Sequence, residues 1–261
     1  MAEKNEWNGH GEEIEDLLRP RTSPIAIRML ESETDIPPGA LRPKRDRAVH
    51  LAQCQAFSLS RRQGRTVAML TEDQWCWGPM MAYGLADPGI AEAYPELRDE
   101  VRKMPRLEPG RYVGILSAPL KTAGFRPEAV LVYCNNAQLL HMLHALSFAG
   151  EGRVDTPLYP IASCALSVVP ALEGRYAVTL PDPGELGRAL AGEDEIIFSL
   201  PPAKVALLVA QLRAFEERKW GYRHHAFLEM RPDFPRPEFY KKFMRECGGD
   251  AGDLPVWPEE P

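Results

Sequence analysis

Proline is the residue that most constrains the fold of this chain, because it occurs 25 times in 261 residues. That is about twice the roughly 5% share of an average protein. A proline inside a helix or a central strand removes a backbone hydrogen bond, so each proline cluster ends one element and separates it from the next. The clusters lie at positions 37 and 38, 43, 157 and 160, 181 and 183, 201 and 202, and towards the C-terminus. We therefore expect many short helices and strands joined by proline-rich loops.

The segments between these clusters show the apolar runs of strands and the three-to-four-residue periodicity of helices. We predict strands over residues 25–30, 65–70, 112–117, 129–133, 176–180 and 195–200. We predict helices over residues 12–18, 51–59, 90–103, 137–148, 203–219 and 237–245, and two shorter ones near Cys76 and Cys164. The order lacks regular strand–helix–strand alternation, which favours an α+β fold with a single mixed sheet and flanking helices over a doubly wound sheet.

The length of the chain is sufficient for one large domain with its own hydrophobic core. We expect a polar N-terminal segment over residues 1–19 and a single α+β domain over residues 20–247. The residues after Gly248 are rich in glycine, proline and acidic side chains, and we expect a flexible tail over 248–261.

Composition and charge are those of an ordinary globular protein, with 44% hydrophobic and 26% charged residues. The formal net charge of −6 argues against nucleic acid as a partner. One short basic run is flanked by prolines, and we interpret it as a solvated loop. It consists of Arg42, Lys44, Arg45 and Arg47.

The N-terminal stretch MAEKNEWNGHGEE is polar and acidic, without the basic start and apolar core of a secretory signal. No apolar run approaches the roughly 18 residues that a membrane-spanning helix needs. We therefore expect a cytoplasmic protein that makes no membrane contact. In that compartment cysteines are kept reduced, or serve as ligands or core residues.

The cysteines are the residues most able to carry chemistry in this chain. No two of them have the CxxC spacing of zinc ribbons or ferredoxins. A lone cysteine is most often a small buried hydrophobe, so a core role is the simplest interpretation of each one taken singly. The five are Cys54, Cys76, Cys134, Cys164 and Cys247.

The surroundings of three cysteines favour a more specific role. Cys54 lies on the apolar face of the predicted 51–59 helix, whereas Cys76 and Cys164 stand where predicted helices begin. The partial positive charge at the start of a helix lowers the pKa of a thiol and favours the thiolate. A thiolate is the form that binds a metal or attacks a substrate, so these positions are candidates for either role.

The other motifs that we considered do not indicate a function. The chain has no glycine-rich phosphate loop of the GxGxxG or GxxxxGK[ST] type and no GxSxG elbow of a serine hydrolase. His141 and His144 are spaced for a metal pair or a proton shuttle on one helix, but no third ligand lies near them in sequence. We favour two half-buried histidines bonded to backbone or water. The pair His224-His225 belongs to an aromatic packing segment.

Several short motifs occur in a fixed order along the chain. They are Ser23-Pro24-Ile25-Ala26, Cys54 with Arg62-Gln63-Gly64, Cys76 with Gly78 and Gly84, Ala137-Gln138, Cys164, Gly187-Arg188, Glu195 and Leu200-Pro201. Together they resemble domain of unknown function family 169 over roughly residues 20 to 215. In that family's pattern the cysteines matching Cys54, Cys76 and Cys164 recur, whereas Cys134 and Cys247 fall outside it. The family has no established reaction, so the resemblance implies a site and not an activity.

Two positions depart from the family pattern. Asn136 stands where the family tends to have a proline before its alanine-glutamine pair, and an aspartate is missing between Gly187 and Arg188. The backbone at the first position and the charge at the second therefore differ from those of the family.

Three thiolates from three helical segments are too few to close a structural zinc site but suit a [4Fe-4S] cluster with one open iron. Our leading hypothesis is a cytoplasmic iron–sulfur protein whose cluster metal is bound by Cys54, Cys76 and Cys164. The apolar neighbours would shield the cluster from water. They are Phe57, Trp75, Trp77 and Ile161.

The open iron would receive a small anionic molecule for redox, sulfur-transfer or lyase-type chemistry. We predict that Arg188 and Gln138 bind this substrate, because a guanidinium forms bidentate contacts with anionic groups. The alternative roles of these two residues are a surface ion pair and a helix cap. A redox or accessory protein is a further candidate partner.

Two other classes of function remain as alternatives. One is a non-enzymatic binding or accessory protein in which the cysteines are core residues. The other is a zinc or cysteine-nucleophile enzyme with one activated thiol and His141 or His144 as its base. The sequence does not decide whether the protein is an enzyme.

Overall fold

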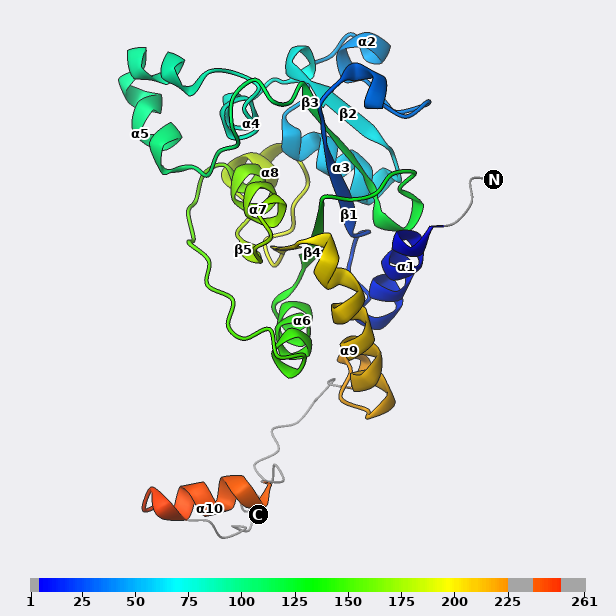
Figure 1. Ribbon diagram of the computed structural model, residues 1–261, viewed down its shortest axis with the longest axis vertical. Helices are drawn as coiled ribbons and strands as arrows, with labels where there is room; N and C mark the ends of the chain where they lie inside the picture. Colours follow the sequence, from blue (N-terminus) through cyan, green and yellow to red (C-terminus); the bar gives the residue numbers. More distant parts are fainter. Residues whose placement is uncertain (1–4, 225–236, 250–261) are drawn as a thin grey trace, which may run out of the picture. The chain divides into compact units, whose positions relative to one another are not determined.

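The computed structural model describes residues 5–224 and 237–249 of the chain (Figure 1). The chain divides into two compact units, Met1–His224 and His225–Pro261. The described part of the second unit contains one helix, α10 (Glu238–Glu246), close to the helix predicted over residues 237–245. Most of the predicted tail, residues 250–261, lies outside the described residues, as does His225.

The first unit is built on one sheet of six strands in the order β2-β3-β1-β4-β6-β5. Each strand pairs with its neighbours in antiparallel orientation. All six predicted strands are confirmed, because each short apolar run has the length and composition of a strand. Their bounds are β1 (Ile25–Leu30), β2 (Val67–Leu70), β3 (Gly114–Pro119), β4 (Ala129–Cys134), β5 (Ala177–Thr179) and β6 (Ile196–Leu200).

Helices surround this sheet, which confirms the α+β class. The α-helices of the first unit are α1 (Glu6–Leu18), α2 (Pro43–Arg47), α3 (Gln53–Gln63), α4 (Trp77–Ala82), α5 (Pro95–Lys103), α6 (Asn136–Phe148), α7 (Ser163–Leu172), α8 (Pro183–Arg188) and α9 (Val205–Glu217). Short 3₁₀ turns are η1 (Glu33–Asp35), η2 (Thr71–Asp73), η3 (Pro88–Ala93), η4 (Leu120–Thr122), η5 (Pro202–Lys204) and η6 (Tyr222–His224). Within residues 5–224 and 237–249, no helix is long and apolar enough to cross a membrane.

Both faces of the sheet are covered, so the first unit has two hydrophobic cores. Alternate residues of a strand point to opposite faces, and in β1 the side chains of Ile25 and Ile27 join one core while Ala26 joins the other. Helices α3, α4, α5 and α7 pack on the Ile25 face. Helices α1, α6 and α9 pack on the Ala26 face (Figure 1).

Several helices begin or end at residues other than those we predicted. Helix α1 begins at Glu6, because the side chains of Asn5 and Asn8 form a reciprocal capping box at its start. The helix predicted over residues 90–103 is divided into η3 and α5 at Pro95, which occupies the first turn of α5. Buried Ile14 and Leu18 place α1 in the core of the first unit, although its overall composition is polar.

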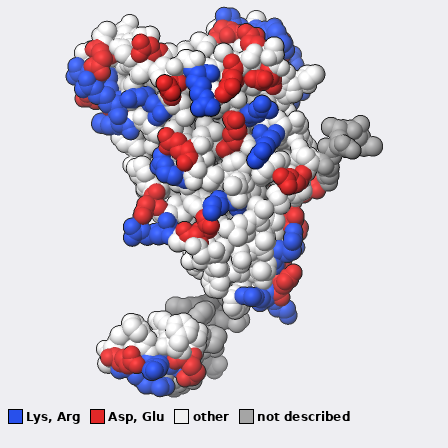
Figure 2. Space-filling model, in the orientation of Figure 1, with Lys and Arg blue, Asp and Glu red and all other residues white. Residues whose placement is uncertain are grey.

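Charged side chains do not separate by sign on the face of the molecule that Figure 2 shows. On the face shown in Figure 2, the lysines and arginines are interspersed with aspartates and glutamates. This distribution agrees with the small net charge of the chain.

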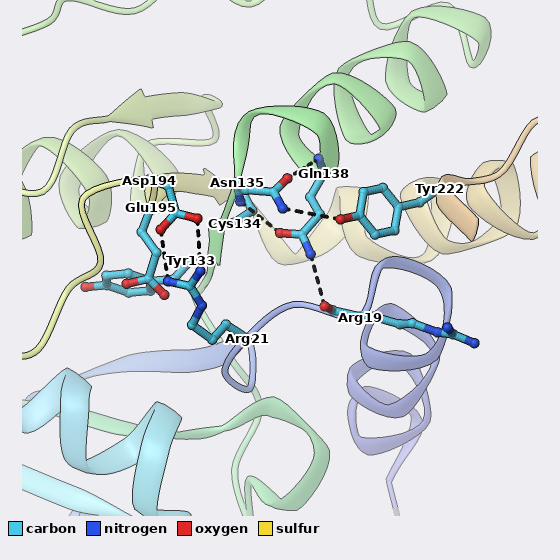
Figure 3. Close-up of a pocket in the computed structure, with 9 residues that line it drawn as sticks. All are labelled: Arg19, Arg21, Tyr133, Cys134, Asn135, Gln138, Asp194, Glu195 and Tyr222. Carbon is cyan, nitrogen blue, oxygen red and sulfur yellow. Dashed lines mark hydrogen bonds and ion pairs between the residues drawn. The ribbon is translucent and has the colours of Figure 1, made fainter. Parts of the chain in front are cut away.

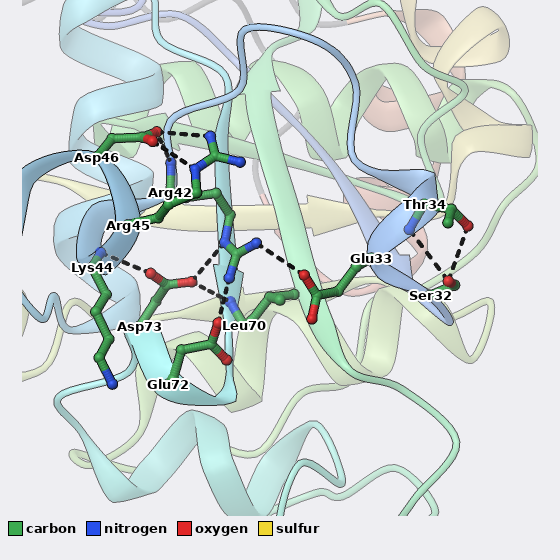
Figure 4. A network of polar contacts seen from close by, with 10 residues as sticks. All are labelled: Ser32, Glu33, Thr34, Arg42, Lys44, Arg45, Asp46, Leu70, Glu72 and Asp73. Carbon is green, nitrogen blue, oxygen red and sulfur yellow. Dashed lines mark hydrogen bonds and ion pairs between the residues drawn. The ribbon is translucent and has the colours of Figure 1, made fainter.

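The basic run at residues 42–47 is only partly the solvated loop that we predicted: Lys44, Arg45 and Arg47 are exposed, but the segment is helical and Arg42 is buried. Residues 43–47 form α2, and Arg42 before it is only 5% exposed. Its guanidinium Nε donates to Asp73 Oδ2 at 3.0 Å, and its other nitrogens pair with Glu33 and Glu72 (Figure 4). A run of basic residues does not show which carboxylates lie beside it in the fold. The sequence pattern therefore could not identify the buried ion pair.

Asp73 is the centre of this network. It is fully buried, and besides Arg42 its carboxylate accepts hydrogen bonds from the backbone N–H groups of Lys44 and Leu70, at 2.8 and 3.0 Å. Its own carbonyl accepts from Leu51 N at 3.0 Å, and the carbonyl of Leu51 accepts from Trp75 N at 2.8 Å. The network therefore fixes the entry to α3 beside the segment that leads to Cys76.

We predict that Asp73→Ala lowers the free energy of unfolding by about 3–5 kcal/mol. The substitution leaves the Arg42 guanidinium buried without its main partner, and removal of one member of a buried ion pair typically has a cost of this size. Urea denaturation of the two proteins measures the difference. Arg45→Ala is the matched control and should change the stability little, because Arg45 pairs with Asp46 at the surface, where water screens the interaction. A loss below about 1 kcal/mol for Asp73→Ala would contradict the assignment.

Candidate functional site

Three of the five cysteines line one cavity of about 230 Å³ on the Ile25 face of the sheet. Cys54 is the second residue of α3, Cys76 immediately precedes α4, and Cys164 is the second residue of α7. These segments are separated by 22 and 88 positions in the sequence, as their residue numbers show (76 − 54 and 164 − 76). The fold thus brings together the three cysteines that were predicted to act jointly.

Local structure explains why each cysteine sits at the cavity. The Gln55 side chain accepts from Ala52 N at 2.9 Å and so fixes the first turn of α3. Cys76 is extended, with φ −113° and ψ 136°, and the chain enters α4 directly after it. Before α7, Ala162 adopts a left-handed conformation with φ 59°, which is unfavourable for a residue with a Cβ atom. Strained backbone of this kind is concentrated at functional sites.

The other two cysteines lie elsewhere. Cys134 ends β4 in the core on the opposite face, and its thiol donates to Ile196 O at 3.4 Å. Cys247 follows α10 in the second unit and is exposed. The division into three clustered and two separate cysteines is the one that the family resemblance implied.

Arg188 lines the same cavity, on the last turn of α8. We predicted no helix over these residues, but Asp182 caps the segment by accepting from Glu185 N at 2.9 Å, and Pro183 occupies the first turn. Aspartate followed by proline is a helix-start signal that the sequence did contain. The Arg188 guanidinium lies 5.0 Å from the centre of the Trp75 ring, a cation–π contact at the exposed rim.

Gln138 is not brought to the cysteine cavity. It lines a different pocket of about 290 Å³, with Arg19, Asn135 and Tyr222 (Figure 3). Its Nε2 donates to the carbonyls of Leu18 and Arg19 at 2.9 and 3.0 Å, while its Oε1 accepts from Asn135 N at 2.8 Å. The polar atoms of Gln138 are therefore used to cap α6 and to tie it to α1, as in the alternative role of a helix cap.

Neither His141 nor His144 lines the cysteine cavity. Both belong to α6, which packs on the opposite face of the sheet. The His141 ring is buried, lies 2.8 Å from Ala137 O through Nδ1 and packs edge-on against Tyr222, whereas His144 is exposed. In the described structure, a base for a cavity thiol would therefore have to be a residue other than His141 or His144.

The family of the chain follows from a direct comparison. Residues 13–211 match the family model DUF169, described as "Uncharacterised ArCR". The chain belongs to this family. All the cavity-lining cysteines and Arg188 lie within the matched residues. None of the curated proteins and none of the solved structures compared with the chain matches it.

Two thiols of the cavity in this DUF169 protein, those of Cys54 and Cys164, are hard to ionise. Burial, with the nearby carboxylates of Glu185 and Asp182, raises the pKa of Cys54 to about 12. Burial also raises the pKa of Cys164 well above its usual value, and the neighbouring Cys76 thiol and Asp182 carboxylate add to this shift. The helix-start effect that favours a thiolate is outweighed at these two positions by desolvation, because the ionised sulfur would lose its contact with water.

No compact single-ion site is present among the residues that the structure describes. In residues 5–224 and 237–249, no group of three or more His, Cys, Asp and Glu side chains is arranged to hold one metal ion. Ligands of one zinc ion lie about 2.0–2.3 Å from it, so their donor atoms must converge within roughly 4–5 Å of each other. The three cysteines share a cavity without converging on one point in this way.

Glu185 is a candidate residue that our sequence reasoning missed. It is buried beneath the DUF169 cavity, and its Oε1 accepts hydrogen bonds from Tyr133 and Ser163, each at 3.0 Å. Burial raises the pKa of Glu185 to about 7; the Tyr133 hydrogen bond opposes this shift and the charge of Asp182 adds to it. The spacing of Asp182 and Glu185 is that of a capping box, which would have located the helix but not its burial.

We predict that Glu185 makes stability fall as the pH rises. Its carboxyl has a folded pKa of about 7 against about 4.5 in the unfolded chain, so the folded state retains a proton that the unfolded state loses between these values. The free energy of unfolding should therefore decrease by roughly 3 kcal/mol from pH 4.5 to pH 7 through this group. Glu185→Gln keeps both hydrogen-bond acceptances and should flatten this slope.

Urea denaturation at pH 5 and pH 8 measures the effect as the difference between Glu185→Gln and the unaltered protein. Glu173→Gln is a matched control, because Glu173 is a half-exposed carboxylate that pairs with Arg175 at the surface. Equal pH slopes for the unaltered protein and Glu185→Gln would show that Glu185 titrates normally.

Proposed function

We propose that the cavity of this DUF169 protein holds a [4Fe-4S] cluster through Cys54, Cys76 and Cys164, with one iron left open to a small anionic ligand. The observation that carries the proposal is the meeting of these three cysteines, from three distant segments, in one cavity. A plain core role would not require this arrangement. Buried cysteines that only fill space are free to be scattered, as Cys134 is.

The number of cysteines suits a cluster with an open iron. A cluster presents separate irons to its ligands, so its cysteines need not converge on one point. Four cysteines are the usual complement of a [4Fe-4S] cluster, and three therefore leave one iron available.

The cavity wall supplies the surroundings that such a group needs. Trp77, Pro79 and Ile161 line it together with the cysteines, and apolar walls limit the access of water. Arg188 stands at the rim, where its guanidinium can bind an anion in bidentate fashion. The cysteines would then bind the cluster, and Arg188 at the rim would bind the anion.

Cluster binding would require the cavity thiols to lose their protons. Because burial holds the pKa of Cys54 near 12 in the free protein, iron must displace a proton that would otherwise stay bound. Metal binding to thiols releases protons and strengthens with pH. The chemistry that the open iron supplies would be redox, sulfur-transfer or lyase-type, in the cytoplasm, with a redox or accessory protein as a partner.

We predict that anaerobic reconstitution of the full chain with ferrous iron and sulfide gives a brown protein with about four irons and four acid-labile sulfides per chain. Cys54→Ala, Cys76→Ala and Cys164→Ala should each lose most of this iron and the visible absorption. Cys134→Ala and Cys247→Ala are the matched controls and should retain both, because these two cysteines lie outside the cavity. Zinc without iron, or equal losses in all five variants, would refute the cluster.

We predict that Arg188→Ala weakens the binding of small anions to the reconstituted protein by about 10- to 150-fold, since a charge-assisted hydrogen bond is worth about 1.5–3 kcal/mol. Acetate and sulfite serve as probes, with the visible spectrum as the signal. Arg188→Lys should recover part of the affinity, because an ammonium lacks the planar fork. Arg153→Ala is the control, since its side chain is 84% exposed and remote from the cavity lining. Unchanged affinity in Arg188→Ala, or its unfolding, would reassign Arg188 to structure.

A further inference from the structure

We propose that Gln53 is a ligand-binding residue of the cysteine cavity, and that the ligand is a small carboxylate held between the Gln53 carboxamide and the Arg188 guanidinium. The inference deepens the proposed function, on which it rests for the identity of the cavity. Its test uses the metal-free protein, so that it can fail separately from the cluster.

Gln53 is the first residue of α3, lines the cavity, and is only 1% exposed. Its Oε1 accepts from Gln74 Nε2 at 2.9 Å. Its Nε2 is buried and has no hydrogen-bond partner among the described residues, and the same holds for Oε1 of Gln74. A buried polar atom without a partner is costly and rare, so a donor left in this state on a cavity wall indicates that a ligand supplies the acceptor.

Gln53 keeps one unpaired polar atom whether or not the oxygen and nitrogen of the two amides are exchanged. Exchanging oxygen and nitrogen in both Gln53 and Gln74 reverses the bond between them but leaves one polar atom of each side chain unpaired. In every arrangement, Gln53 therefore has one polar atom available. The other groups on the wall indicate that it serves as a donor.

Those other groups favour a negatively charged ligand. Helix α3 begins on the cavity wall, and it has no side-chain cap at Ala52. An uncapped helix start presents N–H groups and partial positive charge. The carboxylate on the lining, Asp182, accepts from the backbone N–H groups of Ser163 and Glu185 and so is occupied within the fold.

Size and shape narrow the class of anion. In the metal-free protein, the cavity of about 230 Å³ has the volume of roughly seven or eight water molecules, at about 30 Å³ each, so it takes a ligand of a few carbons. A carboxylate offers two oxygens in one plane, one pair of lone pairs for the guanidinium fork and another for the amide donor. The apolar side chains of Trp77 and Ile161 would contact the rest of the ligand.

A ligand-binding Gln53 differs from a structural one in its effect on stability. Because its amide nitrogen is unpaired in the free protein and its Oε1 has one partner, Gln74, Gln53→Leu should lower the Tm only slightly. Gln138→Leu should lower the Tm, since the amide of Gln138 is fully bonded within the fold. This contrast between two buried glutamines is a readout that a merely structural role for Gln53 would not produce.

The experiment titrates pyruvate into the metal-free full chain and follows tryptophan fluorescence, to which Trp75 and Trp77 at the cavity contribute. Gln53→Leu should weaken pyruvate binding by about 10- to 150-fold, the range for a hydrogen bond to a charged group. Gln53→Glu, which keeps the size but replaces the donor by an acceptor, should also lose affinity and serves if Gln53→Leu fails to fold. Gln63→Leu, an exposed glutamine at the other end of α3, is the matched control and should bind normally.

Each outcome decides the proposal. Unchanged pyruvate affinity in the Gln53 variants, or no pyruvate binding to the unaltered metal-free chain, would overturn it. Sulfate binding as tightly as pyruvate, with the same dependence on Gln53, would overturn the assignment to carboxylates. If iron never enters the protein but the Gln53 effect is found, only the cluster proposal fails; if the cluster forms and the Gln53 variants bind pyruvate normally, only this inference fails.

Discussion

The buried carboxylate of Asp73 is the interaction on which the cysteine cavity depends. It neutralises Arg42 and accepts the backbone N–H groups of two separate segments, at Lys44 and Leu70. The backbone beside it is bonded to Leu51, just before α3. A charge in the interior is tolerated only when paired and hydrogen-bonded, so this group has few alternative positions. The cavity wall that carries Cys54 and Cys76 therefore has a fixed shape before any ligand enters.

The sequence predicts those features of the structure that depend on residues close together in the chain. The strands were located correctly because each is a short apolar run between turn residues, and the sheet requires nothing more of its residues. The grouping of the cysteines followed from a family pattern and from their helix-start positions, both of which can be read along the chain. The burial of Arg42, Glu185 and Gln53 could not be predicted, because it depends on partners 31, 52 and 21 positions away.

Gln138, which we predicted to bind the substrate, lies outside the cysteine cavity for the same reason: its place depends on distant residues. Its position at the start of a helix resembles that of Gln53, so local sequence does not distinguish the two glutamines. In the fold, Gln138 meets two carbonyls at the end of α1 and is fully bonded. Gln53 meets one other glutamine and the cavity. Function is expected where local consistency fails, so the incompletely bonded side chain is the better candidate.

The charge balance of the cavity indicates what it can accept. Two of its thiols are neutral because burial raises their pKa, and Asp182 is occupied by backbone donors. The groups that remain are donors: the Arg188 guanidinium, the Gln53 amide and the uncapped start of α3. An anionic occupant would satisfy them, because its oxygens accept hydrogen bonds from these donors. A neutral apolar occupant would leave them unpaired, and the cost of burying unpaired donors argues against it.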